Sequence, residues 1–178
     1  MWRLSLTERQ HRNGSSVVAD RELRRLQNEL ALAERRIHEP LKLALVSPLQ
    51  LLEEVEAELA DSCKGSNVAL WTRVDIDLPS FLADGTQLRS ALIGMGETAV
   101  AAAGDGGEVL LEAERRRCPD DESVTLRVTD SGSGGAQDLR ARLPVAAGVA
   151  ADHGGHLRVD PGPDGGSIIT LQLPFVAG

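Results

Sequence analysis

The sequence is poor in aromatic residues, which make up 2% of its 178 residues and include no tyrosine. A hydrophobic fraction of 42% and a charged fraction of 26% are nevertheless ordinary for a globular protein. The core must therefore be packed from leucine, valine, isoleucine and alanine. The length suits one compact domain with an extension.

Long hydrophobic runs and cysteines are also scarce. No run of 18 or more apolar residues occurs, which excludes a membrane-spanning helix. The N-terminus, MWRLSLTERQHRNGSS, lacks the apolar stretch of a signal peptide. Cys63 and Cys118 show no metal-ligand spacing, and we interpret them as free thiols of a cytoplasmic protein. A disulfide between them is the alternative.

Positive charge is in the minority, because 19 basic residues face 27 acidic ones and the net charge is −8. This balance argues against a nucleic-acid partner, which requires a basic face. A basic run at Arg115 to Arg117 lies beside Asp120, Asp121 and Glu122. We interpret this run as the solvated tip of a hairpin rather than as a phosphate-binding patch.

The N-terminal part of the chain differs in pattern from the rest. Residues 1–19 have no periodicity and are predicted to form a flexible tail. Residues 20–40 carry apolar side chains at steps of three and four, the seam of a coiled coil or helical hairpin. The seam consists of Leu23, Leu26, Leu30, Ala33 and Ile37. Because so narrow a stripe cannot hold a short helix in water, we predict a homodimer through residues 20–38, or packing on the domain as the alternative.

Residues 41–178 show the order strand, helix, strand, helix, hairpin, helix, hairpin. Helix starts are marked by Ser47 before Pro48 and by Asp84 three residues before Gln87. Each helix has one apolar stripe to bury; that of the second helix consists of Leu88, Leu92, Met95 and Ala99. The pattern therefore predicts an α+β fold of two layers, in which a mixed sheet carries the helices on one face.

Three segments of this part resemble a known family. The stretch VDIDLPSFLADGTQLRSALIGMGETAVAAA (74–103) resembles the linker and asparagine-box helix of a bacterial sensor kinase. The stretch VTLRVTDSGSGG (124–135) resembles the strand and first glycine box, and ADHGGHLRVDPGPDGGSIITLQLP (151–174) resembles the last helix end and closing hairpin. In this order and spacing they identify residues 41–178 as a member of the histidine-kinase-like ATPase superfamily. The resemblance implies the Bergerat-type fold of a sensor kinase's ATP-binding catalytic domain.

The resemblance also implies roles for individual residues. Asp130 would accept a hydrogen bond from the exocyclic amine of adenine. Gly132 and Gly134 would let the backbone approach the adenine ring and the sugar closely. The family's asparagine box places two polar residues four positions apart on one helix face, where they hold Mg²⁺ against the phosphates. Those positions align with Gly94 and Thr98.

These last positions depart from the family pattern, because neither Gly94 nor Thr98 supplies an amide. Glu97 could supply an oxygen ligand for Mg²⁺, but it lies about 100° round the helix from Thr98. The family also has a lid, a long segment with a second glycine box that wraps the triphosphate, and this lid is missing here. The glycines of the second glycine box align with Arg140 and Arg142. Losing three or four contacts with the phosphates and the metal ion removes on the order of 6 kcal/mol of binding free energy. A micromolar nucleotide affinity would therefore weaken to about tens of millimolar. We therefore predict weak or no nucleotide binding and no cofactor.

Two histidines match family signatures. His38, in the stretch HEPL, echoes the phosphoacceptor signature, but residues that the family places between Glu39 and Pro40 are absent. We interpret His38 as an exposed residue at a helix C-terminus, with the phosphoacceptor role as the alternative. His153 matches the family's His-Gly-Gly turn and is predicted to be structural.

The sequence thus predicts a degenerate, non-catalytic ATPase-like domain that acts as a dimeric docking or regulatory module in two-component signalling. Its expected partner is the receiver domain of a response regulator, or a partner kinase, rather than nucleic acid or a membrane. One alternative is an ATP-binding catalytic domain of a histidine kinase, which would use ATP and Mg²⁺. The other is a histidine phosphotransferase that keeps an inert ATPase-like domain.

Overall fold

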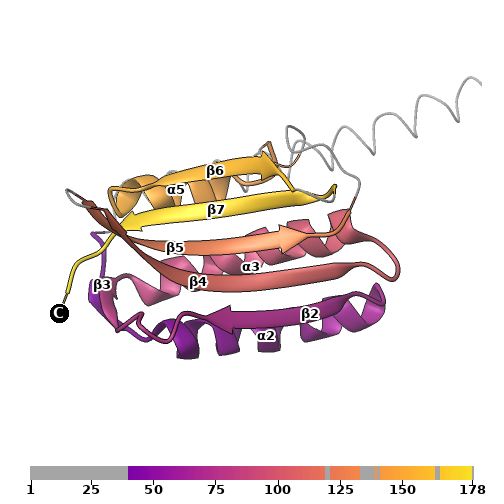
Figure 1. The fold of residues 1–178 in the computed structure, drawn as a ribbon, viewed down its shortest axis with the longest axis horizontal. Helices are drawn as coiled ribbons and strands as arrows, with labels where there is room; N and C mark the ends of the chain where they lie inside the picture. Colours follow the sequence, from indigo (N-terminus) through magenta and orange to yellow (C-terminus); the bar gives the residue numbers. More distant parts are fainter. Residues whose placement is uncertain (1–39, 119–120, 133–138, 140, 163–164, 178) are drawn as a thin grey trace, which may run out of the picture. The chain divides into compact units, whose positions relative to one another are not determined.

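The computed structural model describes residues 40–118, 121–132, 139, 141–162 and 165–177. Residues 1–39 lie outside the described residues, so the predicted tail, the predicted dimerisation helix and His38 stay predictions. The elements are β1 (Ala44–Val46), α2 (Pro48–Gly65), β2 (Ala69–Val74), β3 (Phe81–Ala83), α3 (Gly85–Ala103), β4 (Glu108–Cys118), β5 (Asp121–Asp130), α5 (Pro144–Asp152), β6 (His156–Pro161) and β7 (Ser167–Pro174). This is the predicted order with one addition, the short strand β3 (Figure 1).

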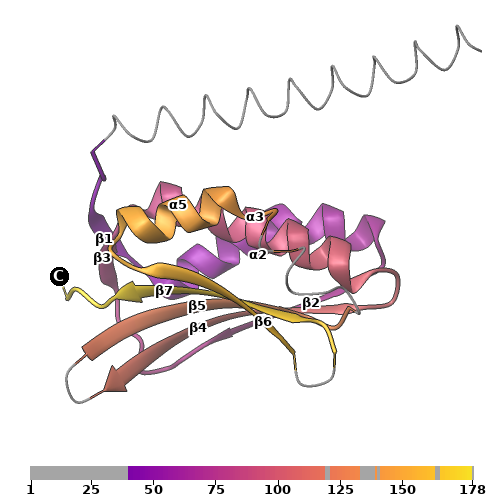
Figure 2. The ribbon, with the colours of Figure 1, turned by 90° about the horizontal axis from the view of Figure 1, so that it is seen from above.

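The described strands form a five-stranded sheet with the order β2-β4-β5-β7-β6, and β1 pairs with β3 in a separate two-stranded sheet. Strand β2 runs parallel to β4, whereas the other neighbours in the large sheet are antiparallel. Figure 2 shows α2, α3 and α5 together on one side of this sheet. The predicted two-layer α+β fold, a mixed sheet with helices on one face, is confirmed.

The core lies between the helices and the sheet. The predicted stripe of α3 is fully buried, as are Leu52 and Val55 of α2. The two helices approach closely at Gly96, where an added Cβ atom would lie 2.3 Å from Leu59 Cδ1. Gly96 is therefore a packing residue, because a side chain at this position would require the buried Leu59 side chain to move.

The basic run is placed differently from the prediction. Strands β4 and β5 continue to Cys118 and Asp121, so Arg115 to Arg117 belong to a strand rather than to a loop. The side chain of Arg115 is 17% exposed and pairs with Glu122 at 2.7 Å. Its guanidinium also lies 4.2 Å from the ring centroid of Phe175. The interpretation as a solvated tip is wrong for Arg115, because cross-strand pairing and the aromatic ring hold it against the domain.

The capping prediction for α3 is confirmed. Asp84 Oδ1 accepts a hydrogen bond from the backbone N–H of Gln87 at 3.1 Å, and Oδ2 accepts one from that of Lys42 at 3.0 Å. Burial raises the pKa of Asp84, but these hydrogen bonds outweigh it and hold the pKa below its ordinary value. The ionised carboxylate therefore stabilises both the helix start and the segment before β1.

We expect Asp84→Ala to lower the free energy of unfolding by about 1–2 kcal/mol at neutral pH. Asp84→Asn keeps a capping oxygen and should lose less. Because the native pKa is depressed, the contribution of the carboxylate is present above the unfolded pKa and is lost as pH falls through the native pKa. Urea unfolding at pH 7 and at about pH 3 tests this, and a gap between wild type and Asp84→Ala that widens in acid would contradict it.

Candidate functional site

Asp130, the predicted adenine acceptor, lies at the end of β5 and is only 3% exposed. Its Oδ1 atom accepts a hydrogen bond from the backbone N–H of Gly132 at 2.9 Å. Its Oδ2 atom is buried and has no hydrogen-bond partner among the described residues. Burial raises the pKa of Asp130 above its ordinary value, against the opposing effect of hydrogen bonds from Gly132 and Ser167. Ionisation of this carboxyl group is therefore less favourable than it is in water.

We expect the stability difference between Asp130→Asn and wild type to depend on pH. Because the native pKa is raised, the native state binds more protons than the unfolded state above about pH 3.9. Wild-type stability therefore falls as pH rises through the native pKa, whereas asparagine cannot ionise. In urea unfolding, the free energy of unfolding of Asp130→Asn relative to wild type should increase between about pH 3.5 and pH 7. Asp61→Asn, at an exposed position of α2, is the control, and a shift in favour of wild type would refute the expectation.

The backbone that follows Asp130 is packed against α3. A Cβ atom added at Gly132 would lie 1.9 Å from the carbonyl oxygen of Ala102, at the end of that helix. A Cβ atom added at Gly166 would lie 1.9 Å from the carbonyl oxygen of Asp130. At Gly132 the described backbone approaches the protein itself, and the predicted approach to the adenine ring and the sugar stays a prediction. Gly134 lies outside the described residues.

The asparagine-box positions lie on α3. A Cβ atom at Gly94 would meet no heavy atom within 4 Å, so this glycine leaves open space where the family has a polar side chain. The Thr98 hydroxyl donates a hydrogen bond to the carbonyl oxygen of Gly94 at 2.7 Å. Glu97 is exposed. At these two positions the helix therefore presents no side chain comparable with the metal-binding amide of the family.

The lid region is described only in part. Arg142, aligned with a glycine of the second box, is exposed, and its backbone N–H donates to Leu139 O at 2.9 Å. Arg140, aligned with the other glycine, lies outside the described residues. Among the described residues, no group of three or more histidine, cysteine, aspartate or glutamate side chains could hold a metal ion.

His153 connects the end of α5 to the start of α3. Its Nε2 atom accepts a hydrogen bond from the backbone N–H of Asp84 at 3.0 Å. Its Nδ1 atom lies 2.8 Å from Val149 O and donates to it, which fixes the neutral tautomer with the proton on Nδ1. The structural role predicted for His153 is confirmed. The His-Gly-Gly motif predicted the turn. The contact with Asp84 could not be predicted from the sequence, because the two residues lie 69 positions apart.

Cys63 is a buried free thiol, and burial raises its pKa. Among the described residues, no helix combines the length and the apolarity that crossing a membrane requires.

Comparisons with known proteins agree with this fold. No protein-family model matches the chain. The adaptive-response sensory kinase SasA of Synechococcus sp. (strain CC9902) is 29% identical over 146 residues, which cover 70% of this chain and 37% of that protein. The catalytic domain of histidine kinase ThkA aligns with a TM-score of 0.66 and 18% identity, covering 76% of this chain and 97% of that chain. ThkA in complex with the response regulator protein TrrA aligns with a TM-score of 0.72 and 19% identity, covering 89% of this chain and 50% of that chain.

The described domain therefore has the fold of the histidine-kinase-like ATPases, as the three sequence segments predicted. Its sequence is similar to that of sensory kinases, and the chain spans 37% of the length of the SasA kinase.

Proposed function

We propose that this domain is a docking or regulatory module of two-component signalling that binds Mg-ATP weakly or not at all. One observation carries the proposal: at the asparagine-box positions of α3, Gly94 has no side chain and the Thr98 hydroxyl is bonded to the helix backbone at 2.7 Å. A magnesium ion coordinates oxygen ligands in near-ideal octahedral geometry. A threonine hydroxyl turned onto its own helix and a glycine do not fit that requirement.

The surroundings of Asp130 support the same proposal. Asp130 is 3% exposed, and although it is one of the residues that line a pocket, its Oδ2 atom is buried. The backbones at Gly132 and Gly166 lie too close to Ala102 and to Asp130 itself to admit even a Cβ atom. Losing the phosphate and metal contacts costs on the order of 6 kcal/mol, so cellular ATP would not fill the site.

Without nucleotide, the remaining use of the fold is as a binding surface. ThkA, which shares this fold, was crystallised with a response regulator protein. We extend that partnership to this chain: the partner is a receiver domain or a partner kinase, and the chain is a cytoplasmic homodimer through residues 20–38.

A second function, an ATP-binding catalytic domain, is favoured by one observation. Asp130 is retained at the adenine position, and its buried Oδ2 atom has no hydrogen-bond partner among the described residues. The exocyclic amine of adenine would satisfy that acceptor.

Two assays separate these functions and the relay through His38. Incubation with radiolabelled ATP and Mg²⁺ should leave the chain unlabelled and should not transfer label to a separate histidine-bearing kinase domain. Incubation with a phosphorylated receiver domain should yield no phosphohistidine on wild type. ATP-dependent label would establish the kinase, whereas receiver-derived label that is lost in His38→Ala would establish the phosphotransferase.

A further inference from the structure

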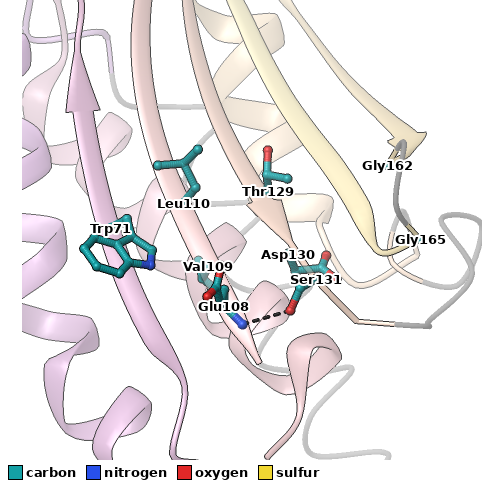
Figure 3. Close-up of a pocket in the computed structure, with 9 residues that line it drawn as sticks. All are labelled: Trp71, Glu108, Val109, Leu110, Thr129, Asp130, Ser131, Gly162 and Gly165. Atoms are coloured by element: carbon teal, nitrogen blue, oxygen red, sulfur yellow. Dashed lines mark hydrogen bonds between the residues drawn. The ribbon is translucent and has the colours of Figure 1, made fainter. Parts of the chain in front are cut away.

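A pocket lies on the open face of the sheet, away from α3 and from Gly94 and Thr98. Leu110 alternates along β4 with Val109 and Leu111, both fully buried, so its side chain points away from the helices. Trp71 on β2 and Thr129 on β5 are the register partners of Leu110. Figure 3 shows these three side chains along one face, with the helices behind the sheet.

Gly162, which follows β6, and Gly165, which precedes β7, line one side of the pocket. Its volume is about 350 Å³, within the range of small-molecule sites. The Trp71 indole forms the opposite wall and is 59% exposed, an unusual state for so large an aromatic group. At the rim, the Glu108 backbone N–H donates to Ser131 Oγ at 2.8 Å, which fixes the start of β4 (Figure 3).

The charges on this face single out Glu108. Along β4, Glu112 and Glu114 point to the same side as Glu108, and both pair with Arg73 and Arg127. Glu108 is exposed, and its carboxylate has no ion pair or hydrogen bond among the described residues. The pocket thus combines an exposed aromatic ring with a carboxylate that has no neutralising partner.

We propose that this pocket binds a small free organic cation. An aromatic or flat apolar part would stack on Trp71 and cover Leu110, and an ammonium or guanidinium group would face Glu108. Cations are attracted both by the carboxylate and by the negative face of the indole ring. Asp130 also lines this pocket, whereas Gly94 and Thr98 do not. The proposal rests on Trp71, Leu110 and Glu108, so it does not depend on whether the domain binds Mg-ATP.

The test uses the full chain. Because the sequence contains two tryptophans, Trp2→Phe leaves Trp71 as the only fluorescent indole. Titration with 2-phenylethylammonium chloride should change Trp71 fluorescence saturably, with a Kd of about 1 mM, as expected for so few heavy atoms. The anion 3-phenylpropionate, similar in shape, should bind at least about fivefold more weakly.

Two variants identify the groups responsible. Glu108→Gln should weaken 2-phenylethylammonium binding about fivefold, whereas Glu53→Gln, at an exposed position of α2, should leave it unchanged. Trp71→Leu should abolish binding, followed through the amide NMR shifts of Leu110 and Thr129. The proposal is overturned by no saturable signal up to about 20 mM, by equal binding of the anion, or by unchanged affinity of Glu108→Gln.

Discussion

Gly155→Ala is expected to lower the free energy of unfolding by about 3 kcal/mol. The backbone N–H of Gly155 donates to Ala150 O at 2.8 Å and so ends α5. A Cβ atom at this position would lie 2.0 Å from Gln172 O and 2.9 Å from Leu173 Cδ2. Gln172 is paired with both β5 and β6, so its carbonyl cannot retreat without disrupting the sheet. Overpacking of this kind costs about 1–3 kcal/mol, and a backbone clash falls at the upper end.

Urea unfolding at neutral pH measures the effect of Gly155→Ala. Gly65→Ala is the matched control, because a Cβ atom at the end of α2 would meet no heavy atom within 4 Å. We expect the control to stay within about 1 kcal/mol of wild type. Equal stabilities for the two variants would show that β7 does not lie against the His-Gly-Gly turn as described.

Arg127→Met is the second variant for which we expect a large effect, about 2 kcal/mol of destabilisation. Arg73, Glu112 and Arg127 form one row across β2, β4 and β5. The Glu112 side chain is 4% exposed and pairs with both arginines, its distance to Arg127 being 3.3 Å. Arg127 also pairs with Glu114 at 3.1 Å. Removing one partner of a buried charge costs about 3–5 kcal/mol, and the remaining pair with Arg73 reduces this loss.

Arg158→Met provides the comparison for Arg127→Met. Arg158 lies on the same face and pairs with Asp160 at 2.6 Å, but its side chain is 69% exposed. Exposed pairs contribute about 0–1 kcal/mol. If the two arginine variants lose the same stability in urea unfolding, the buried position of Glu112 carries no energetic weight and the account of this row is wrong.

Local signals made much of the fold predictable. Ser47 and Asp84 each accept a hydrogen bond from a backbone N–H three residues later, so their pattern is visible within one helical turn. Strand β3 was missed because its three residues follow Pro79 and Ser80 as a linker would, and its pairing partner β1 lies far away in the sequence. The extension of the β4–β5 hairpin was missed because its strands are rich in charged residues, which cross-strand pairs neutralise.

The sequence predicted which residues belong to the candidate site but not how they are arranged. The motif located Asp130 and Gly132, and the spacing located Gly94 and Thr98. Nothing in the sequence showed that the Gly132 backbone rests on Ala102, since that contact depends on how β5 meets α3. The pocket at Trp71 was missed for the same reason, because it arises from the register of three strands. The available signal was a large aromatic between the half-buried Leu70 and Thr72, on the side of β2 away from the core.

Calorimetric titration of the full chain with Mg-ATP tests the central claim most directly. The asparagine-box positions hold a glycine and a threonine whose hydroxyl is bonded to its own helix backbone. The account therefore predicts no saturable heat at concentrations up to several millimolar ATP, and the same result for Asp130→Asn. Saturable binding with a Kd below about 100 μM, near −5.5 kcal/mol, that is lost in Asp130→Asn would contradict it.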